Sequence, residues 1–155
     1  MTPIAQLLYS AIESGYMTAP QWRDWADRIL ERHENFPTWI IELSLTSSVE
    51  AAQAALLPGM TIEIIPNAEW ICSDDLTIGF LQKMKEEGRI SRLEMLYKAG
   101  LASDGGYSDL SPEEIYHVLN CEERGENIAA LDPIFEACRN QATKAWESIG
   151  KFRIG

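Results

Sequence analysis

The sequence predicts an all-α protein: an irregular or orthogonal bundle of about seven helices joined by short capped turns, with at most one small β-hairpin near residues 60–72. Three observations lead to this fold class. Apolar residues recur at helical spacing along most of the chain. Serine or threonine with glutamate or glutamine three residues later marks several helix starts. Glycine or proline follows the end of most of these segments.

Length and composition predict a single globular helical domain over residues 1–155. A chain of 155 residues has the common size of one domain. Its hydrophobic content of 46% and charged content of 24% are typical of globular proteins. We therefore expect one core that needs neither metal nor disulfide bonds.

The first two helices are predicted from an apolar stripe and a capping box. The first helix ends at Gly15 and carries its stripe on Ile4, Leu7, Leu8, Ala11 and Ile12. The second starts after Thr18, whose capping-box partner is Gln21. Its inward residues are Trp22, Trp25, Ala26 and Ile29.

The sequence of residues 37–72 predicts two short helices and the hairpin. Pro37 opens a helix with Trp39, Ile40 and Leu43 inward, since proline is tolerated in a first turn. A capping box of Ser47 and Glu50 starts a helix from about Val49 to Leu57, which Pro58-Gly59 ends. The β-branched run 60–65 and the run 69–72 then suggest a hairpin.

A helix capped by Ser73 ends at Gly88, and the next starts with Ser91 and Glu94 as its capping box. A glycine that ends one helix and a capping box that starts the next also occur at Gly15 and Thr18, 73 residues earlier. An ancient duplication and two separate αα-hairpins are both open explanations. We favour the hairpins, because side-chain identity outside the turn is poor.

The last two helices follow a loop over residues 103–109, which is rich in turn formers. Ser111, Pro112 and Glu114 predict a helix start, and this helix runs to about Glu123. The longest pattern opens near Asp132-Pro133 and keeps apolar residues on one stripe as far as Ile149.

Charge is the most distinctive feature of the composition, with a formal net charge of −11. Residues 33–82 hold seven acids and no lysine or arginine, and residues 100–138 hold nine acids against Arg124 alone. Residues 83–99 and 139–155 are mildly basic. An acidic surface of this kind most often keeps a protein soluble and monomeric. The alternative is that the acidic segments form one face that binds a basic protein. The expected partner-binding residues are Asp104, Asp109, Glu113, Glu114, Glu122, Glu123 and Glu126.

Other partners and compartments are disfavoured. Nucleic acid binding relies on Lys and Arg clusters that neutralise phosphates, and the chain has no such cluster. The sequence contains no run of about 20 apolar residues, which a membrane-spanning helix needs. The start of the chain does not resemble a secretory signal, and three cysteines are an odd and small number for a disulfide framework. We expect a cytoplasmic protein.

Catalytic and metal motifs are missing from the sequence. His117 and Cys121 share a helix face and Cys138 lies on the next helix, but without a Cys-x-x-Cys pair we reject a zinc site. No phosphate loop, nucleophile elbow or His-Glu-x-x-His occurs. We therefore predict no catalytic residue, no metal and no cofactor.

Three classes of function are consistent with these observations. We favour a non-enzymatic protein-binding module, similar to immunity or antitoxin proteins in charge and size only. The alternatives are a small enzyme or ligand-binding protein whose carboxylates, tryptophans and His117 meet in the fold, and a helical adaptor or oligomer subunit. Charge reversal at Glu113, Glu122 and Glu123 is expected to abolish partner binding with nearly unchanged thermal stability.

Overall fold

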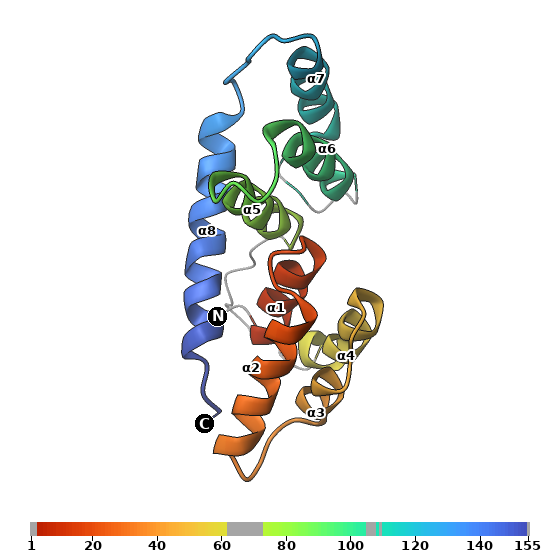
Figure 1. Ribbon diagram of the computed structural model, residues 1–155, viewed down its shortest axis with the longest axis vertical. Helices are drawn as coiled ribbons and strands as arrows, with labels where there is room; N and C mark the ends of the chain where they lie inside the picture. Colours follow the sequence, from red (N-terminus) through yellow and green to blue (C-terminus); the bar gives the residue numbers. More distant parts are fainter. Residues whose placement is uncertain (1–2, 62–72, 105–107, 109, 155) are drawn as a thin grey trace. The chain divides into compact units, whose positions relative to one another are not determined.

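The computed structural model describes residues 3–61, 73–104, 108 and 110–154, and this part of the chain is all-helical (Figure 1). The predicted fold class is thereby confirmed, with eight helices in the described part where about seven were expected. None of these helices is both long enough and apolar enough to cross a membrane. The helices are α1 (Ile4–Glu13), α2 (Ala19–Arg32), α3 (Thr38–Ser44), α4 (Val49–Thr61), α5 (Ser73–Glu86), α6 (Arg92–Ser103), α7 (Pro112–Glu123) and α8 (Asp132–Lys151).

Contacts between residues divide the chain into two compact units. Unit 1 comprises Met1–Trp70 with Trp146–Gly155, and unit 2 comprises Ile71–Ala145. Helix α8 therefore begins in unit 2 and ends in unit 1. The prediction of a single domain over residues 1–155 stays a prediction.

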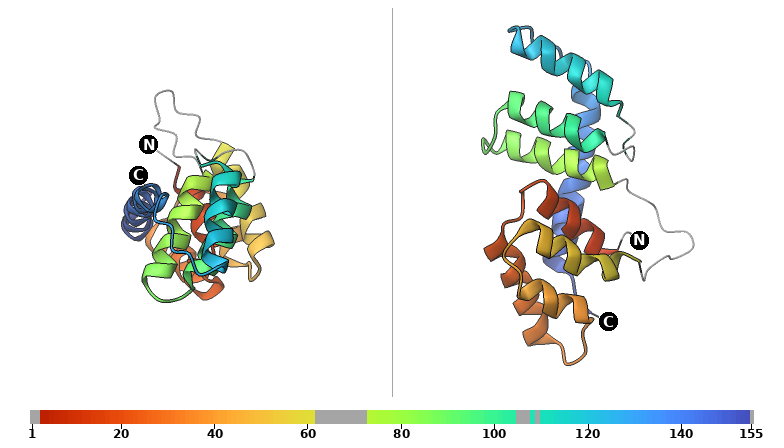
Figure 2. Two further views of the ribbon diagram at one scale, coloured as in Figure 1. Left: turned by 90° about the horizontal axis from the view of Figure 1, so that it is seen from above. Right: turned by 90° about the vertical axis from the view of Figure 1, so that its right-hand side faces the viewer.

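Tryptophans hold the helices of unit 1 together. Helix α1 packs on α4, and α3 packs on both α2 and α4 (Figure 2). The ring of Trp25 in α2 is stacked on that of Trp39 in α3 with 6.3 Å between centroids, and its Nε1 donates a hydrogen bond to the Ile149 carbonyl at 2.9 Å. Trp22 Nε1 donates to Thr46 Oγ1 at 3.0 Å. These three tryptophans are buried, as predicted.

Unit 2 places α6 between α5 and α7, with contacts to both (Figure 2). Phe80 of α5, Leu96 of α6 and Phe135 of α8 are fully buried. Helix α5 also approaches the backbone of α8 closely, because a Cβ atom at Gly79 would lie 2.6 Å from the carbonyl carbon of Cys138. Only glycine fits this contact.

The turns between helices use the predicted chemistry. Gln21 Oε1 accepts a hydrogen bond from the Thr18 backbone N–H at 2.9 Å, and Ser91 Oγ accepts one from Glu94 N–H at 3.1 Å. Gly88 has φ +75°, and Arg89 N–H donates to the Met84 carbonyl at 2.9 Å, the pattern of a Schellman cap. The capping box of Thr18 and Gln21, the N-cap at Ser91 and the stop at Gly88 are confirmed, whereas Ser111 forms no side-chain cap hydrogen bond.

Two predictions for α4 are wrong. The N-cap is Ser48 rather than Ser47, since Ser48 Oγ accepts from the Ala51 N–H at 3.2 Å. The helix also continues through Pro58 to Thr61, where a strand was expected. Gly59 explains this, because a Cβ atom there would lie 2.8 Å from the Trp39 ring and 2.9 Å from Ala5 Cβ. Packing on α1 and α3 offsets the roughly 3 kcal/mol that proline costs inside a helix. The rest of the predicted hairpin, residues 62–72, lies outside the described residues.

The close approach of α5 to α8 gives a stability prediction. We expect Gly79→Ala to lower the free energy of unfolding by at least about 2 kcal/mol, because the new methyl group would overlap the α8 backbone and force the helices apart. Gly88→Ala is the matched control. Nothing lies within 4 Å of its Cβ position, so only the left-handed backbone conformation resists the change, at about 1 kcal/mol. Urea unfolding of the three proteins measures both effects, and equal stability of Gly79→Ala and wild type would contradict the close contact.

Candidate functional site

Helix α7 carries most of the predicted acidic residues and buries its opposite face. Ser111 precedes the helix, Pro112 occupies its first position, and the Ile115 N–H donates to the Ser111 carbonyl at 3.2 Å. Glu113 and Glu114 stand in the first turn, where the helix macrodipole favours carboxylates. The buried side chains of α7 are Ile115, Val118, Leu119 and Cys121.

Hydrogen bonds of Arg92 connect the end of α7 to α6 and α8. The guanidinium of Arg92 donates to Glu122 Oε2 at 3.3 Å, to Asp132 Oδ1 at 3.1 Å and to the carbonyl of Ile128 at 2.7 Å. Only 18% of the Arg92 side chain is exposed. This single side chain therefore fixes the course of the loop between α7 and α8.

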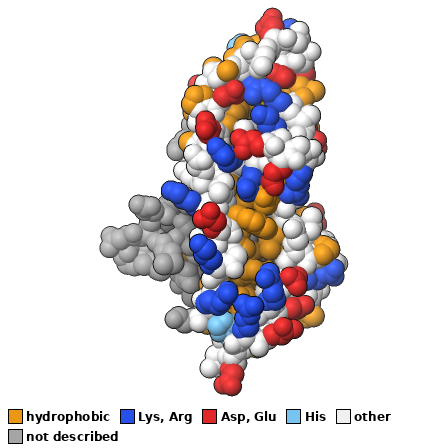
Figure 3. Space-filling view, turned by 60° about the vertical axis from the view of Figure 1, so that its left-hand side comes forward, with side chains coloured by type: hydrophobic (Ala, Val, Ile, Leu, Met, Phe, Trp, Pro, Cys, Tyr) orange, Lys and Arg blue, Asp and Glu red, His pale blue; other side chains and the backbone are white. Residues whose placement is uncertain are grey.

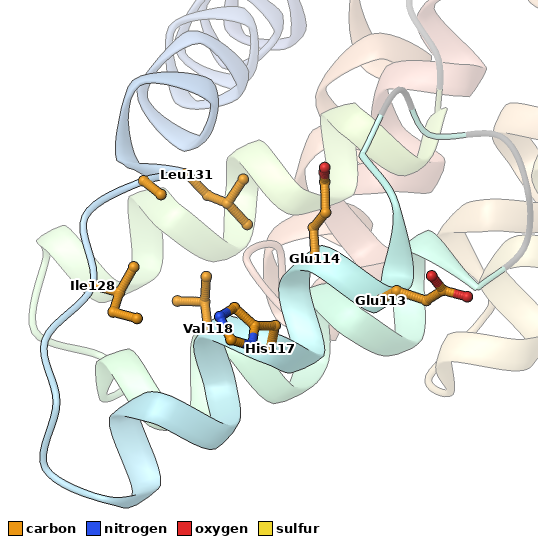
Figure 4. Close-up of a pocket in the computed structure, with 7 residues that line it drawn as sticks. Glu113, Glu114, His117, Val118, Ile128 and Leu131 are labelled. Atoms are coloured by element: carbon orange, nitrogen blue, oxygen red, sulfur yellow. The ribbon is translucent and has the colours of Figure 1, made fainter.

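A groove of about 370 Å³ lies between α7 and this loop. Its floor is apolar, and Glu113, Glu114 and His117 complete its lining (Figure 4). Both carboxylates and the imidazole come from the first two turns of α7, at spacings of three and four residues that place them on one side of the helix. The apolar lining residues are Val118, Ile128, Ala130 and Leu131.

The structure brings only part of the predicted acidic set to this groove. Glu113 and Glu114 are exposed, line it, and have no ion-pair partner within 4 Å among the described residues. Glu123 is exposed on α7, and Asp104 is exposed at the end of α6. Glu126 lies in the loop, 3.9 Å from Arg124 Nη2. Asp109 lies outside the described residues.

Glu122 is held in an ion pair inside unit 2, while its predicted role in partner binding stays a prediction. Its side chain is only 24% exposed and forms the ion pair with Arg92, so it supports the loop from within unit 2. Charge reversal at Glu122 would place two positive groups together in a half-buried position. We therefore expect it to lower stability, contrary to the expectation from the sequence.

Of the cysteine and histidine side chains named from the sequence, His117 and Cys121 lie near each other on α7. Cys121 Sγ lies 3.9 Å from His117 Nε2, while Cys138 is buried where α8 meets Gly79 of α5. Within the described ranges, no group of three or more His, Cys, Asp or Glu side chains is placed to hold a metal ion. The groove thus offers one imidazole between two carboxylates above an apolar floor.

Two tryptophans of unit 1 line another groove. Trp25 and Trp146 line a groove of about 270 Å³ in unit 1, with Arg28 and Asp24 at its rim. These two charges form an exposed ion pair at 3.2 Å. The lining of the α7 groove includes no tryptophan among the residues described. The enzyme or ligand-binding alternative, with carboxylates, tryptophans and His117 in one site, stays a prediction.

Acidic side chains do not cover the whole surface. On the face that Figure 3 displays, Lys and Arg side chains lie among Asp and Glu side chains. Between Pro112 and Glu126, by contrast, five acids stand against Arg124 alone. The excess of negative charge at α7 is therefore a local property.

Sequence reasoning missed the groove floor and the role of Arg92. Ile128 and Ala130 lie in a loop without periodic pattern, so no signal assigns them to a surface, whereas Leu131 was expected on the apolar stripe of the last helix. Arg92 meets residues 30 and 40 positions away along the chain, which a single sequence does not reveal. One signal was present: Glu122 follows the buried Val118 by four residues, which turns it toward the inner face of α7.

Comparisons with known proteins add no assignment, since no family model, no curated protein and no solved structure matches the chain.

The position of Arg92 gives a second stability prediction. We expect Arg92→Met to lower the free energy of unfolding by about 2 kcal/mol, because it leaves two half-buried carboxylates and the Ile128 carbonyl without their donor. Arg28→Met removes an arginine from an exposed ion pair, whose two side chains are 53% and 68% exposed, and serves as control. Such pairs contribute less than about 1 kcal/mol. Chemical unfolding measures both, and an Arg92→Met protein as stable as the control would contradict the role of Arg92.

Proposed function

We propose that this protein is a non-enzymatic binding module that engages a basic segment of another protein through the α7 groove. The observation that carries the proposal is the position of Glu113 and Glu114: two exposed carboxylates at the rim of an apolar groove of about 370 Å³. An apolar anchor flanked by lysine or arginine is the ligand that complements such a surface.

The floor and the rim would contribute differently to binding. A Leu-sized side chain that fills the floor would gain roughly 1.5–3 kcal/mol from burial. The carboxylates of Glu113 and Glu114 are exposed, so their attraction to a basic partner mainly accelerates association and sets specificity. We therefore expect binding that weakens as salt rises but keeps an apolar component.

Helix stability alone does not account for this arrangement. Carboxylates in a first turn stabilise a helix through the macrodipole, and this suits Glu113 and Glu114 wherever they point. The apolar floor beside them has no such role. Ala130 is exposed and Ile128 is half-buried, which leaves apolar surface next to unpaired negative charge.

We place the protein in the cytoplasm. Cys121 and Cys138 are both buried thiols, which suits a reducing compartment. The net charge of −11 and the length of 155 residues are similar to those of immunity and antitoxin proteins that block basic targets, and we propose this type of role by analogy of charge and size alone.

The acidic rim is tested by charge reversal. We expect Glu113→Lys with Glu114→Lys to reduce capture of basic proteins from the native lysate at low salt by at least tenfold, because the attracting charges are replaced by repelling ones. Asp27→Lys with Glu31→Lys is the matched control, since both residues are exposed on α2 and the change in net charge is the same. Quantitative mass spectrometry of the retained proteins compares the variants. An equal loss of capture in both double variants would show that binding depends on net charge alone, which would contradict a specific role of Glu113 and Glu114.

The apolar floor is tested without any change of charge. Ala130→Phe fills the groove, so we expect it to weaken capture of the same proteins at least several-fold. Ala129→Phe is the control, because Ala129 is also exposed in the loop but is not part of the groove lining. If both variants bind like wild type, the partner does not enter the groove, and the proposed site is wrong.

A further inference from the structure

Helix α6 presents an apolar stripe to solvent. Leu93, Tyr97 and Leu101 follow one another at four-residue spacing and are 42%, 54% and 52% exposed. This spacing keeps three large side chains on one side of the helix. Single exposed apolar residues are normal, but a stripe of three on one helix needs an explanation.

About half of each stripe side chain stays exposed after unit 2 has folded. Helix α6 contacts α5 and α7 with its other side, where Met95, Leu96 and Ala99 are buried. On that side Gly100 lies so close to Tyr116 that a Cβ atom would be 2.6 Å from the ring. The exposed halves of Leu93, Tyr97 and Leu101 are therefore the part of the stripe available to another molecule.

Charges beside the stripe favour approach of a second copy of this chain. Glu94 and Lys98 form an ion pair at 3.0 Å on α6, so the flank of the stripe carries both signs. Residues 83–99 hold five bases and three acids in a chain of net charge −11. Two copies of so acidic a chain repel each other less here than at the acidic segments.

Another group of exposed apolar side chains, on α3 and α4, lies in an acidic setting. Leu45 is 79% exposed and follows Ile41 by four residues, while Glu42 and Glu50 are exposed nearby in the sequence. Residues 33–61 include no lysine or arginine. Two copies that met at this place would bring like charges together, so it does not suit self-association.

We propose that two copies of the chain associate through α6, with the helices antiparallel about a twofold axis near Tyr97. A twofold interface brings the same surface of both copies together. Antiparallel pairing then sets Leu93 against Leu101 of the other copy and Tyr97 against its own equivalent. Glu94 of each copy comes within reach of Lys98 of the other, so the ion pair within each helix can be exchanged for one between helices.

The exposed area indicates a weak dimer. Exposed fractions of 42%, 54% and 52% amount to roughly 300 Å² per copy, taking about 200 Å² for a large side chain. Stable interfaces bury about 800 Å² on each partner. The apolar stems of Glu94 and Lys98 would increase the buried area, but it would still be smaller than the area of a stable interface. Association is therefore expected only at high protein concentration.

Sedimentation velocity of the full chain, from micromolar to millimolar concentration, tests the proposal. We expect the wild-type mass to rise toward that of a dimer, and Tyr97→Glu to stay monomeric because it places two carboxylates together on the axis. Leu45→Glu, a change at the most exposed leucine, should associate like wild type. A wild type that stays monomeric throughout, or equal association of Tyr97→Glu and wild type, would overturn the proposal.

Disulfide trapping tests the antiparallel register separately. A mixture of Leu93→Cys and Leu101→Cys proteins should cross-link under mild oxidation at least fivefold more than either alone, since the twofold axis sets each residue against the other. Tyr97→Cys should cross-link with itself, and wild type controls for the three native cysteines. Equal cross-linking of the mixture and the separate proteins would contradict this arrangement.

Discussion

The geometry of the candidate site depends on the guanidinium of Arg92. It joins α6 to Glu122 of α7 and to Asp132 of α8, and its third hydrogen bond holds the Ile128 carbonyl of the loop between them. A side chain that is 82% shielded from solvent needs such a set of acceptors, because an unpaired charge in that position would be costly. The groove exists because this loop is held at a fixed distance from α7.

Acidic residues serve two purposes in unit 2. Glu122 and Asp132 are structural, since they neutralise Arg92. Glu113 and Glu114 stand at the groove and have no such partner in the part of the chain that the structure describes. Net charge alone does not separate the two groups, although only the second is available to another molecule. The proposed function rests on this distinction, and the proposed association through α6 uses a surface where the charges are balanced.

Local rules of sequence predicted the helices well and the site only in part. The Gly15, Gly88, Thr18 and Ser91 signals act within a few residues, so spacing alone located these turns. The predicted end of α4 at Pro58 was wrong, because the packing of Gly59 against Trp39 outweighs the tendency of Pro58 to break the helix. The acidity of α7 was visible in the sequence. Its groove was not, since residues of an irregular loop form the floor and a long-range arginine positions them.

The most direct test of the proposed binding surface is an NMR titration of the ¹⁵N-labelled chain at low salt with a lysine- and arginine-rich peptide that holds one central leucine. The account predicts amide shifts concentrated in the first turns of α7 and in residues 128–131, and clearly weaker binding when serine replaces the leucine. Shifts spread over acidic residues of both units, with equal affinity for the leucine and serine peptides, would contradict it.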